Sequence, residues 1–277
     1  MGGAEVAALV ARGVPALRRR GPYRPPRGAE PDRLDALADA LAGADARAAV
    51  RAGACLGLAA EDCGDALVLR SDPRGARAWL VVVLRPGVVP GAVVEVPHPN
   101  ADLDTEVVGL EVWRRCPGAL YLQAGAHRGA GAPPDARERG DFPADVAARP
   151  DSPFARVAGR LVARGLPQVQ LHGFADRGDV DVVLSPGAAP GSPLLDAVAG
   201  RLAAAGERVG TGDDARWSDL LGRRNVQGLA AAGQGTAFVH LELARAVRRD
   251  ADRRDAVAAA LAGALDDVAG RPAEGVP

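Results

Sequence analysis

Short apolar runs alternate with helical patterns over most of this chain. Runs of apolar, mainly β-branched residues bounded by Gly and Pro predict strands. These runs are residues 78–85, 91–98, 119–125, 167–173, 179–185 and 235–243. Apolar residues at helical spacing predict helices at residues 32–50, 104–115, 152–164, 191–205 and 244–266. Apolar strands that alternate with helices indicate an α/β fold whose sheet is covered on both faces.

The same pattern divides the chain at about residue 75. The first thirty residues are rich in Arg and Pro and predict a helix followed by a link with many turns. With the amphipathic pattern at 32–50, they indicate a helical N-terminal extension over residues 1–75. Residues 76–277 contain all the predicted strands and are expected to form one α/β domain. Within it, residues 129–151 lack periodicity and predict a long irregular loop, a feature that is often functional.

Composition excludes several kinds of chemistry. The chain has 277 residues and a formal charge of −1, and all 34 basic residues are Arg. Without Lys there is neither a Schiff-base lysine nor a P-loop, which needs a Lys after its glycines. A near-neutral chain without a basic stripe is not expected to bind nucleic acid. No GxGxxG follows a predicted strand, which disfavours a dinucleotide enzyme.

The sequence also indicates a cytoplasmic protein with no membrane partner. Its longest apolar run, Trp79 to Leu84, is far too short to cross a bilayer. Near the N-terminus the Arg cluster follows the apolar stretch, whereas in a signal peptide the charge comes first. Three Cys without CxxC spacing favour neither a disulfide framework nor a thiolate zinc site.

The positions of the few histidines point to a metal. Of the four in the chain, His98, His127 and His172 each lie at or just after the end of a predicted strand. The crevice beyond the carboxyl ends of strands is the usual ligand site of open α/β sheets. An isolated His is more often a structural imidazole, but three that converge on one edge are the arrangement zinc needs.

Acidic residues close to the first histidine compete for the role of a further ligand. Asp102 lies in the loop after His98, and Glu106 lies in the first turn of the predicted helix. Asp104 or Thr105 is expected to cap that helix. The carboxylates of Asp102 and Glu106 both remain candidates for the acidic ligand.

Two further residues are candidates for catalysis and substrate binding. Glu242 follows an apolar run, and a buried carboxylate needs either a partner or a function. It is a candidate general base for hydrolysis, or it pairs with Arg245 or Arg248 of the following helix. Arg128 directly follows His127 and could clamp the carboxylate of an acidic substrate.

Four motifs occur in an informative order: PHPNADLDTE, QAGAHR, VQLHGF and GTAFVHLELAR. Over residues 78–250 the chain resembles the zinc-dependent amidohydrolases with a metallocarboxypeptidase-like (phosphorylase/hydrolase-like) fold. The most similar branches are the N-formylglutamate amidohydrolases and the phage poly-gamma-glutamate hydrolases. The resemblance implies a three-layer α/β/α structure with a mixed sheet.

The resemblance also implies roles for individual residues. His98 and His172 match the two histidine ligands of zinc, and Glu242 matches the general base. Asp102 matches the acidic ligand, although the family has Glu at that place, so Glu106 remains its competitor. His127 matches a histidine of the pocket wall and, with Arg128, is expected to contact the substrate.

These observations lead to one functional hypothesis and two alternatives. The first is a zinc-dependent hydrolase that cleaves an amide or peptide-like bond next to a carboxylate. Metal-activated water and the Glu242 base would perform the reaction on a small acidic amide or peptide substrate. The main alternative is a non-catalytic small-molecule-binding or scaffold protein that retains the hydrolase fold. A doubly wound transferase without metal is a third interpretation.

Overall fold

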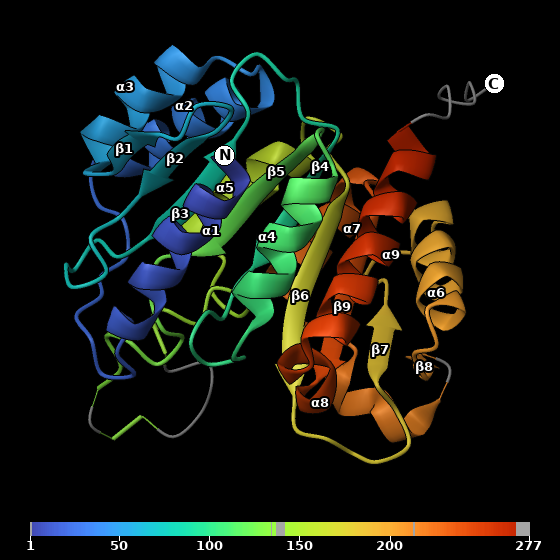
Figure 1. Ribbon diagram of the computed structural model, residues 1–277. Helices are drawn as coiled ribbons and strands as arrows, with labels where there is room; N and C mark the ends of the chain where they lie inside the picture. Colours follow the sequence, from blue (N-terminus) through green and yellow to red (C-terminus); the bar gives the residue numbers. More distant parts are fainter. Residues whose placement is uncertain (1, 134, 137–141, 213, 270–277) are drawn as a thin grey trace.

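A mixed nine-stranded sheet forms the centre of the computed structural model (Figure 1), which describes residues 2–133, 135–136, 142–212 and 214–269. Its strands lie in the order β1-β2-β3-β5-β4-β6-β9-β7-β8. Their bounds are β1 Ala59–Asp62, β2 Leu67–Arg70, β3 Leu80–Leu84, β4 Ala92–Val96, β5 Ala119–Ala124, β6 Gln168–Phe174, β7 Val182–Ser185, β8 Val209–Thr211 and β9 Phe238–Ala244.

The four strands in the middle of the sheet are parallel. β4 pairs in parallel with β5 on one side and with β6 on the other, and β6 pairs in parallel with β9. β1, β2 and β3 form an antiparallel flank, and β7 runs antiparallel to β9. The carboxyl ends of β4, β6 and β9 therefore meet at one edge of the sheet.

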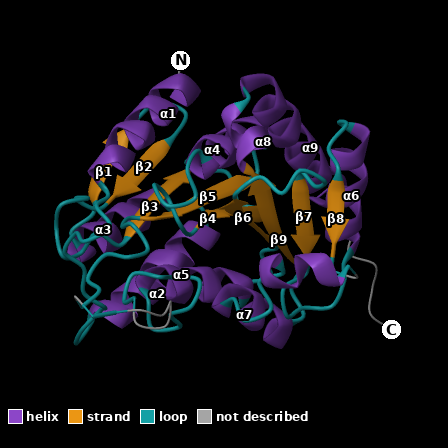
Figure 2. Ribbon diagram, turned by 90° about the horizontal axis from the view of Figure 1, so that it is seen from below, coloured by secondary structure: helices purple, strands orange, loops and turns teal. Residues whose placement is uncertain are grey.

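Helices cover both faces, so the predicted three-layer α/β/α architecture with a mixed sheet is confirmed (Figure 2). The helices are α1 Gly2–Gly13, α2 Glu30–Ala42, α3 Ala46–Leu56, α4 Thr105–Arg115, α5 Pro153–Val162, α6 Pro193–Ala204, α7 Val226–Gln234, α8 Arg245–Arg249 and α9 Ala251–Ala269. α1, α4, α6 and α9 pack on one face, and α2, α3 and α5 pack on the other. Adjacent side chains of β4 show this alternation, since Val94 faces the first group and Val93 the second.

All six predicted strands are present, and two predicted helices are each divided in two. The helix predicted over residues 32–50 is interrupted between α2 and α3, where Ala44 has a φ of 55° and Asp45 caps α3. The helix predicted over residues 244–266 is interrupted at Asp250, whose carboxylate accepts hydrogen bonds from the backbone N–H groups of Asp252 and Arg253. In both places an aspartate competes with the helix for backbone donors.

The first 75 residues contain more than helices. Besides α1, α2 and α3 they supply β1 and β2, two strands that the sequence pattern did not predict. β2 pairs with β3, so this segment extends the same sheet. The division into an extension over residues 1–75 and a domain over residues 76–277 stays a prediction.

Two other features complete the description. Of the predicted irregular loop, residues 134 and 137–141 lie outside the described residues, and the rest is made of turns and irregular backbone. Among the helices described, none is both long enough and apolar enough to span a membrane.

Candidate metal centre

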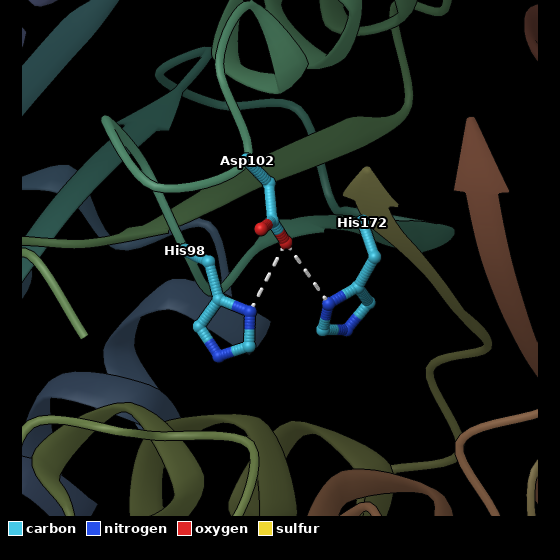
Figure 3. A group of neighbouring side chains, drawn as sticks. All are labelled: His98, Asp102 and His172. Atoms are coloured by element: carbon cyan, nitrogen blue, oxygen red, sulfur yellow. Dashed lines mark hydrogen bonds and ion pairs between the residues drawn. The ribbon is translucent and has the colours of Figure 1, made fainter. Parts of the chain in front are cut away.

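Two histidines and an aspartate converge at the carboxyl edge of the parallel strands (Figure 3). His98 follows β4, Asp102 lies in the loop between β4 and α4, and His172 lies in β6. One oxygen of Asp102, Oδ2, is 3.2 Å from His98 Nδ1 and 3.4 Å from His172 Nδ1. Both histidines are buried. Three ligand atoms of the types zinc prefers therefore face one point.

The conformation of the β4–α4 loop brings Asp102 back toward His98. The His98 carbonyl accepts hydrogen bonds from the N–H groups of Ala101 and Asp102, which closes a tight turn. Asn100 has a φ of 60° in this turn, and its side chain donates to the Leu17 carbonyl over 2.8 Å. Asp104 lies at the N-cap position of α4 with a φ of 70°, but its side chain makes no capping hydrogen bond. The turn, rather than the cap, places the carboxylate of Asp102.

Glu106, the competing acidic residue, is not part of this cluster. It is buried in the first turn of α4, and its Oε2 atom has no hydrogen-bond partner among the described residues. Burial raises the pKa of its carboxyl group. The structure therefore brings Asp102, and not Glu106, to the two histidines.

The outer side of His98 is oriented by a buried carboxylate. His98 Nε2 is 2.9 Å from Asp145 Oδ1, and Arg128 donates to Asp145 Oδ2 over 2.5 Å. Burial raises the pKa of Asp145, but the hydrogen bond with His98 and the charge of Arg128 outweigh it and lower the pKa to about 2. Burial lowers the pKa of His98, but hydrogen bonds with Asp102 and Asp145 outweigh it and raise the pKa. With Nε2 held by an ionised partner, the Nδ1 side of the ring is directed toward the cluster. The sequence alone provides no mechanism for Asp145.

The outer side of His172 is oriented by an amide. His172 Nε2 donates to Gln170 Oε1 over 2.8 Å. The amide nitrogen of Gln170 donates to Glu95 over 2.7 Å, which leaves its oxygen as the acceptor. Burial lowers the pKa of His172 to about 4. A neutral ring with its proton on Nε2 presents an unprotonated Nδ1 to Asp102.

Asp102 Oδ2 and His172 Nδ1 are thus both electron-pair donors, and they face each other across 3.4 Å. Burial raises the pKa of Asp102, but contacts with His172 and His98 outweigh it, and the pKa lies well below its usual value. Two largely buried atoms of this kind face each other only with a cation between them, which is either a proton or a metal ion. The donor set therefore fits a metal ion.

The other predicted site residues lie around this cluster. The register of β6 and β9 pairs His172 with Glu242, which is half-buried. His127 is also half-buried, and its Nδ1 accepts from the backbone N–H of Gly129 over 3.0 Å. Arg128 reaches the cluster indirectly, through Asp145. Their catalytic and substrate-binding roles stay predictions.

His240 is a residue for which sequence analysis found no role. It lies two positions before Glu242 in β9, and its ring stacks on that of His172 with centroids 4.5 Å apart. Ligand atoms of His172, His240 and Glu242 form a second group within 4.8 Å. The signal was present in the sequence, because alternation along a strand puts residues 240 and 242 on one face.

Comparison with known proteins finds resemblance in structure only. No family model matches the chain, and no curated protein is detectably similar to it. A bacteriophage poly-gamma-glutamate hydrolase is 16% identical over 65% of this chain and 86% of its own, with a TM-score of 0.46. A metallo-carboxypeptidase from Burkholderia cenocepacia is 13% identical over 80% of this chain and 68% of its own, with a TM-score of 0.43. Succinylglutamate desuccinylase from Vibrio parahaemolyticus is 12% identical over 76% of this chain and 77% of its own, with a TM-score of 0.44. At such values the likeness concerns the general fold.

Proposed function

We propose that this chain is a zinc-dependent hydrolase that cleaves an amide or peptide-like bond next to a carboxylate. The observation that carries the proposal is the convergence of His98 Nδ1, His172 Nδ1 and one oxygen of Asp102. Two imidazoles and a carboxylate are a frequent ligand set of catalytic zinc, which keeps a further position open. When bound, zinc would polarise the scissile carbonyl and lower the pKa of water.

Glu242 is the residue best placed to move protons in this reaction. It lies beside His172 in the β6–β9 register, at the edge of the sheet where the cluster lies. Its carboxylate would accept a proton from the attacking water and return it to the leaving amine. The neighbouring His240 is kept neutral, since burial holds its pKa well below the usual value.

Arg128 and His127 are proposed to contact the substrate. Both are half-buried on the segment that follows β5. A guanidinium carries five N–H donors, so the bond from Arg128 to Asp145 leaves others for a substrate carboxylate. His127 would stabilise the oxyanion or bind the carboxylate. The substrate class that fits is a small acidic amide or peptide.

Metal analysis combined with a hydrolysis assay tests the proposal. Protein purified without chelator is expected to hold about one zinc ion per chain. Asp102→Asn is expected to lose this metal, whereas Glu106→Gln retains it because Glu106 lies outside the cluster. The substrates to assay are N-acyl amino acids and matched amides that lack the carboxylate. Hydrolysis should require zinc and favour the acidic members.

Each outcome distinguishes the alternatives. Protein that neither retains zinc nor gains it on addition contradicts the metal site. Loss of zinc in Glu106→Gln but not in Asp102→Asn reverses the ligand assignment. Zinc binding without hydrolysis of any acyl amino acid indicates a binding or scaffold protein on this fold.

A further inference from the structure

The buried guanidinium of Arg248 connects three separate segments at the carboxyl edge of the sheet. Arg248 lies in α8, just after β9, and is 5% exposed. Its Nε donates to the Leu243 carbonyl over 3.0 Å, and its Nη2 donates to the Phe174 carbonyl over 2.9 Å. Its Nη1 donates to the carbonyl of Leu103. One side chain thus joins the end of β9, the end of β6 and the β4–α4 loop.

Each of these segments carries one residue of the site. Leu103 directly follows Asp102, and Leu243 directly follows Glu242. Phe174 lies two residues after His172. We propose that Arg248 is a positioning residue, which sets the mutual distances of Asp102, His172 and Glu242 through the backbone of the segments that carry them. This inference rests on the proposed hydrolase function.

The chemistry of the side chain fits this role. A guanidinium is planar and presents its donors in a fixed fork, so it can bind several carbonyls in set directions. Lys has a single ammonium on a flexible stem and does not reproduce that fork. Burial lowers the pKa of Arg248, while the charges of Asp102, Asp104 and Glu242 raise it and thereby offset part of the cost of burying a cation.

Gly173 provides independent support. A Cβ atom at this position would lie 2.5 Å from Cζ and 2.6 Å from Nε of Arg248. These contacts are too short, so the guanidinium would have to move. Moving it would break hydrogen bonds to three carbonyls. Position 173 lies between His172 and Phe174 on β6 and must therefore lack a side chain for Arg248 to reach across the strand ends.

Four variants test the inference. Arg248→Lys retains the charge without the fork, Arg248→Ala removes the side chain, and Gly173→Ala displaces an intact guanidinium. Arg249→Lys is the matched control on the exposed side of the same helix. Zinc affinity, kcat and KM are measured well below the midpoint of thermal unfolding of each variant. Millimolar guanidinium chloride is then added as a chemical rescue.

The three test variants are expected to weaken zinc affinity about 10–100-fold, the usual effect of residues that orient metal ligands. At saturating zinc, kcat should fall more than KM rises, because Glu242 is also displaced. Guanidinium should restore part of the zinc affinity and kcat of Arg248→Ala and nothing in Gly173→Ala. Arg249→Lys should match the wild type in all respects.

A purely structural role gives a different result. The inference would be overturned if the variants had lower thermal midpoints but the zinc affinity and kcat of the wild type. It would also be overturned if guanidinium failed to rescue Arg248→Ala and Gly173→Ala had unchanged activity. If Arg248→Ala does not fold, Arg248→Lys and Gly173→Ala decide. If the wild type neither binds zinc nor hydrolyses any substrate, the proposed function fails, and not the positioning of these segments.

Discussion

Two rows of polar side chains cross the same face of the sheet, and they differ in charge. The inner row runs in register through Glu95 of β4, Gln170 of β6, His240 of β9 and Ser185 of β7. The outer row lies two residues nearer the carboxyl edge, where His172 pairs with Glu242. His98 and Asp102 join the outer row from the β4–α4 loop.

The inner row is uncharged at neutral pH. Burial raises the pKa of Glu95 to about 8, so its carboxyl group holds a proton at pH 7. Burial keeps the pKa of His240 well below its usual value. His240 Nδ1 has no hydrogen-bond partner within the described part of the chain. A neutral row of this kind avoids the cost of burying charge behind the site.

The outer row contains the ionised groups of the site. Asp102 has a pKa well below its usual value, and Asp145 behind His98 has a pKa of about 2. The sheet thus separates two functions over two residues of each strand. Charged groups that could bind a cation lie at the edge, and neutral groups that hold them in place lie behind. Gln170 connects the rows through its bond to His172.

The largest effect is expected for Glu242→Gln in the outer row. Gln retains the size of the side chain and removes the proton acceptor. We expect kcat to fall roughly 10²–10⁴-fold, the usual contribution of a positioned base, with zinc content unchanged. The measurement is kcat with zinc analysis and a thermal melt on the same sample. Glu111→Gln, which removes a surface glutamate paired with Arg114, is the control. A destabilised but fully active Glu242→Gln would show that Glu242 has a structural role.

The next effect distinguishes the two histidines that stack on each other. His172→Ala removes a proposed zinc ligand of the outer row and should weaken zinc affinity more than roughly 100-fold, beyond what residues outside the proposed ligand set contribute. His240→Ala alters the inner row and should retain zinc affinity within about tenfold. Competition with a chelating dye measures both. An equal loss in the two variants would place the metal at His172, His240 and Glu242 instead.

A third prediction concerns the protonated carboxyl of Glu95. Its folded pKa of about 8 exceeds the unfolded value of 4.5, so the folded state holds this proton more tightly than the unfolded state. The stability that the bound proton contributes is therefore complete below pH 4.5 and is lost as the pH rises to 8. Glu95→Gln resembles the neutral form and should match the wild type at pH 4. At pH 7 it should be more stable by about 3 kcal/mol, because pH 7 lies about 2.5 units above the unfolded pKa and each unit corresponds to about 1.4 kcal/mol.

Urea unfolding at pH 4, 7 and 8 measures this dependence. Glu111→Gln, at the surface, should show no such trend between wild type and variant. A difference between Glu95→Gln and the wild type that stays constant over this range would mean that Glu95 does not change its protonation there. The inner row would then contain a buried charge, and the contrast between the rows would be wrong.

Much of the fold could be predicted because the central strands are buried on both faces. β4 and β5 are apolar along almost their whole length, which makes them recognisable from composition alone. β1 is mostly exposed, with the sequence AAED, and β8 has three residues, so neither gives an apolar run. Edge strands such as these are defined by their pairing partners, which a local pattern does not contain.

The candidate site, like the fold, could be predicted only where a local pattern contains the information. His98, His172 and Glu242 could be brought together because parallel strands end at one edge. The choice between Asp102 and Glu106 depended on a turn in which Asn100 has a positive φ. The role of Asp145 could not be predicted because its contact with His98 spans 47 residues of sequence. Arg248 was considered only as a partner for Glu242, since its three carbonyl acceptors are contributed by the tertiary fold.

The smallest effect is expected where the two rows join. Gln170→Leu removes the acceptor of the His172 Nε2 proton, so the tautomer with an unprotonated Nδ1 is no longer favoured. We expect zinc affinity to fall about tenfold, the lower end of what partners of metal ligands contribute.

Gln168→Leu is the matched control, because Gln168 is equally buried on the same face of β6 but donates to the Ala158 carbonyl. Gln170→Leu also removes the contacts of Gln170 with Glu95, Gln227 and Asn225 and should lose more stability than Gln168→Leu, so zinc affinity is measured well below the unfolding midpoint of both variants. Only Gln170→Leu should weaken zinc binding and shift its pH dependence. Equal zinc affinity in the two variants would mean that stacking on His240, and not Gln170, orients His172.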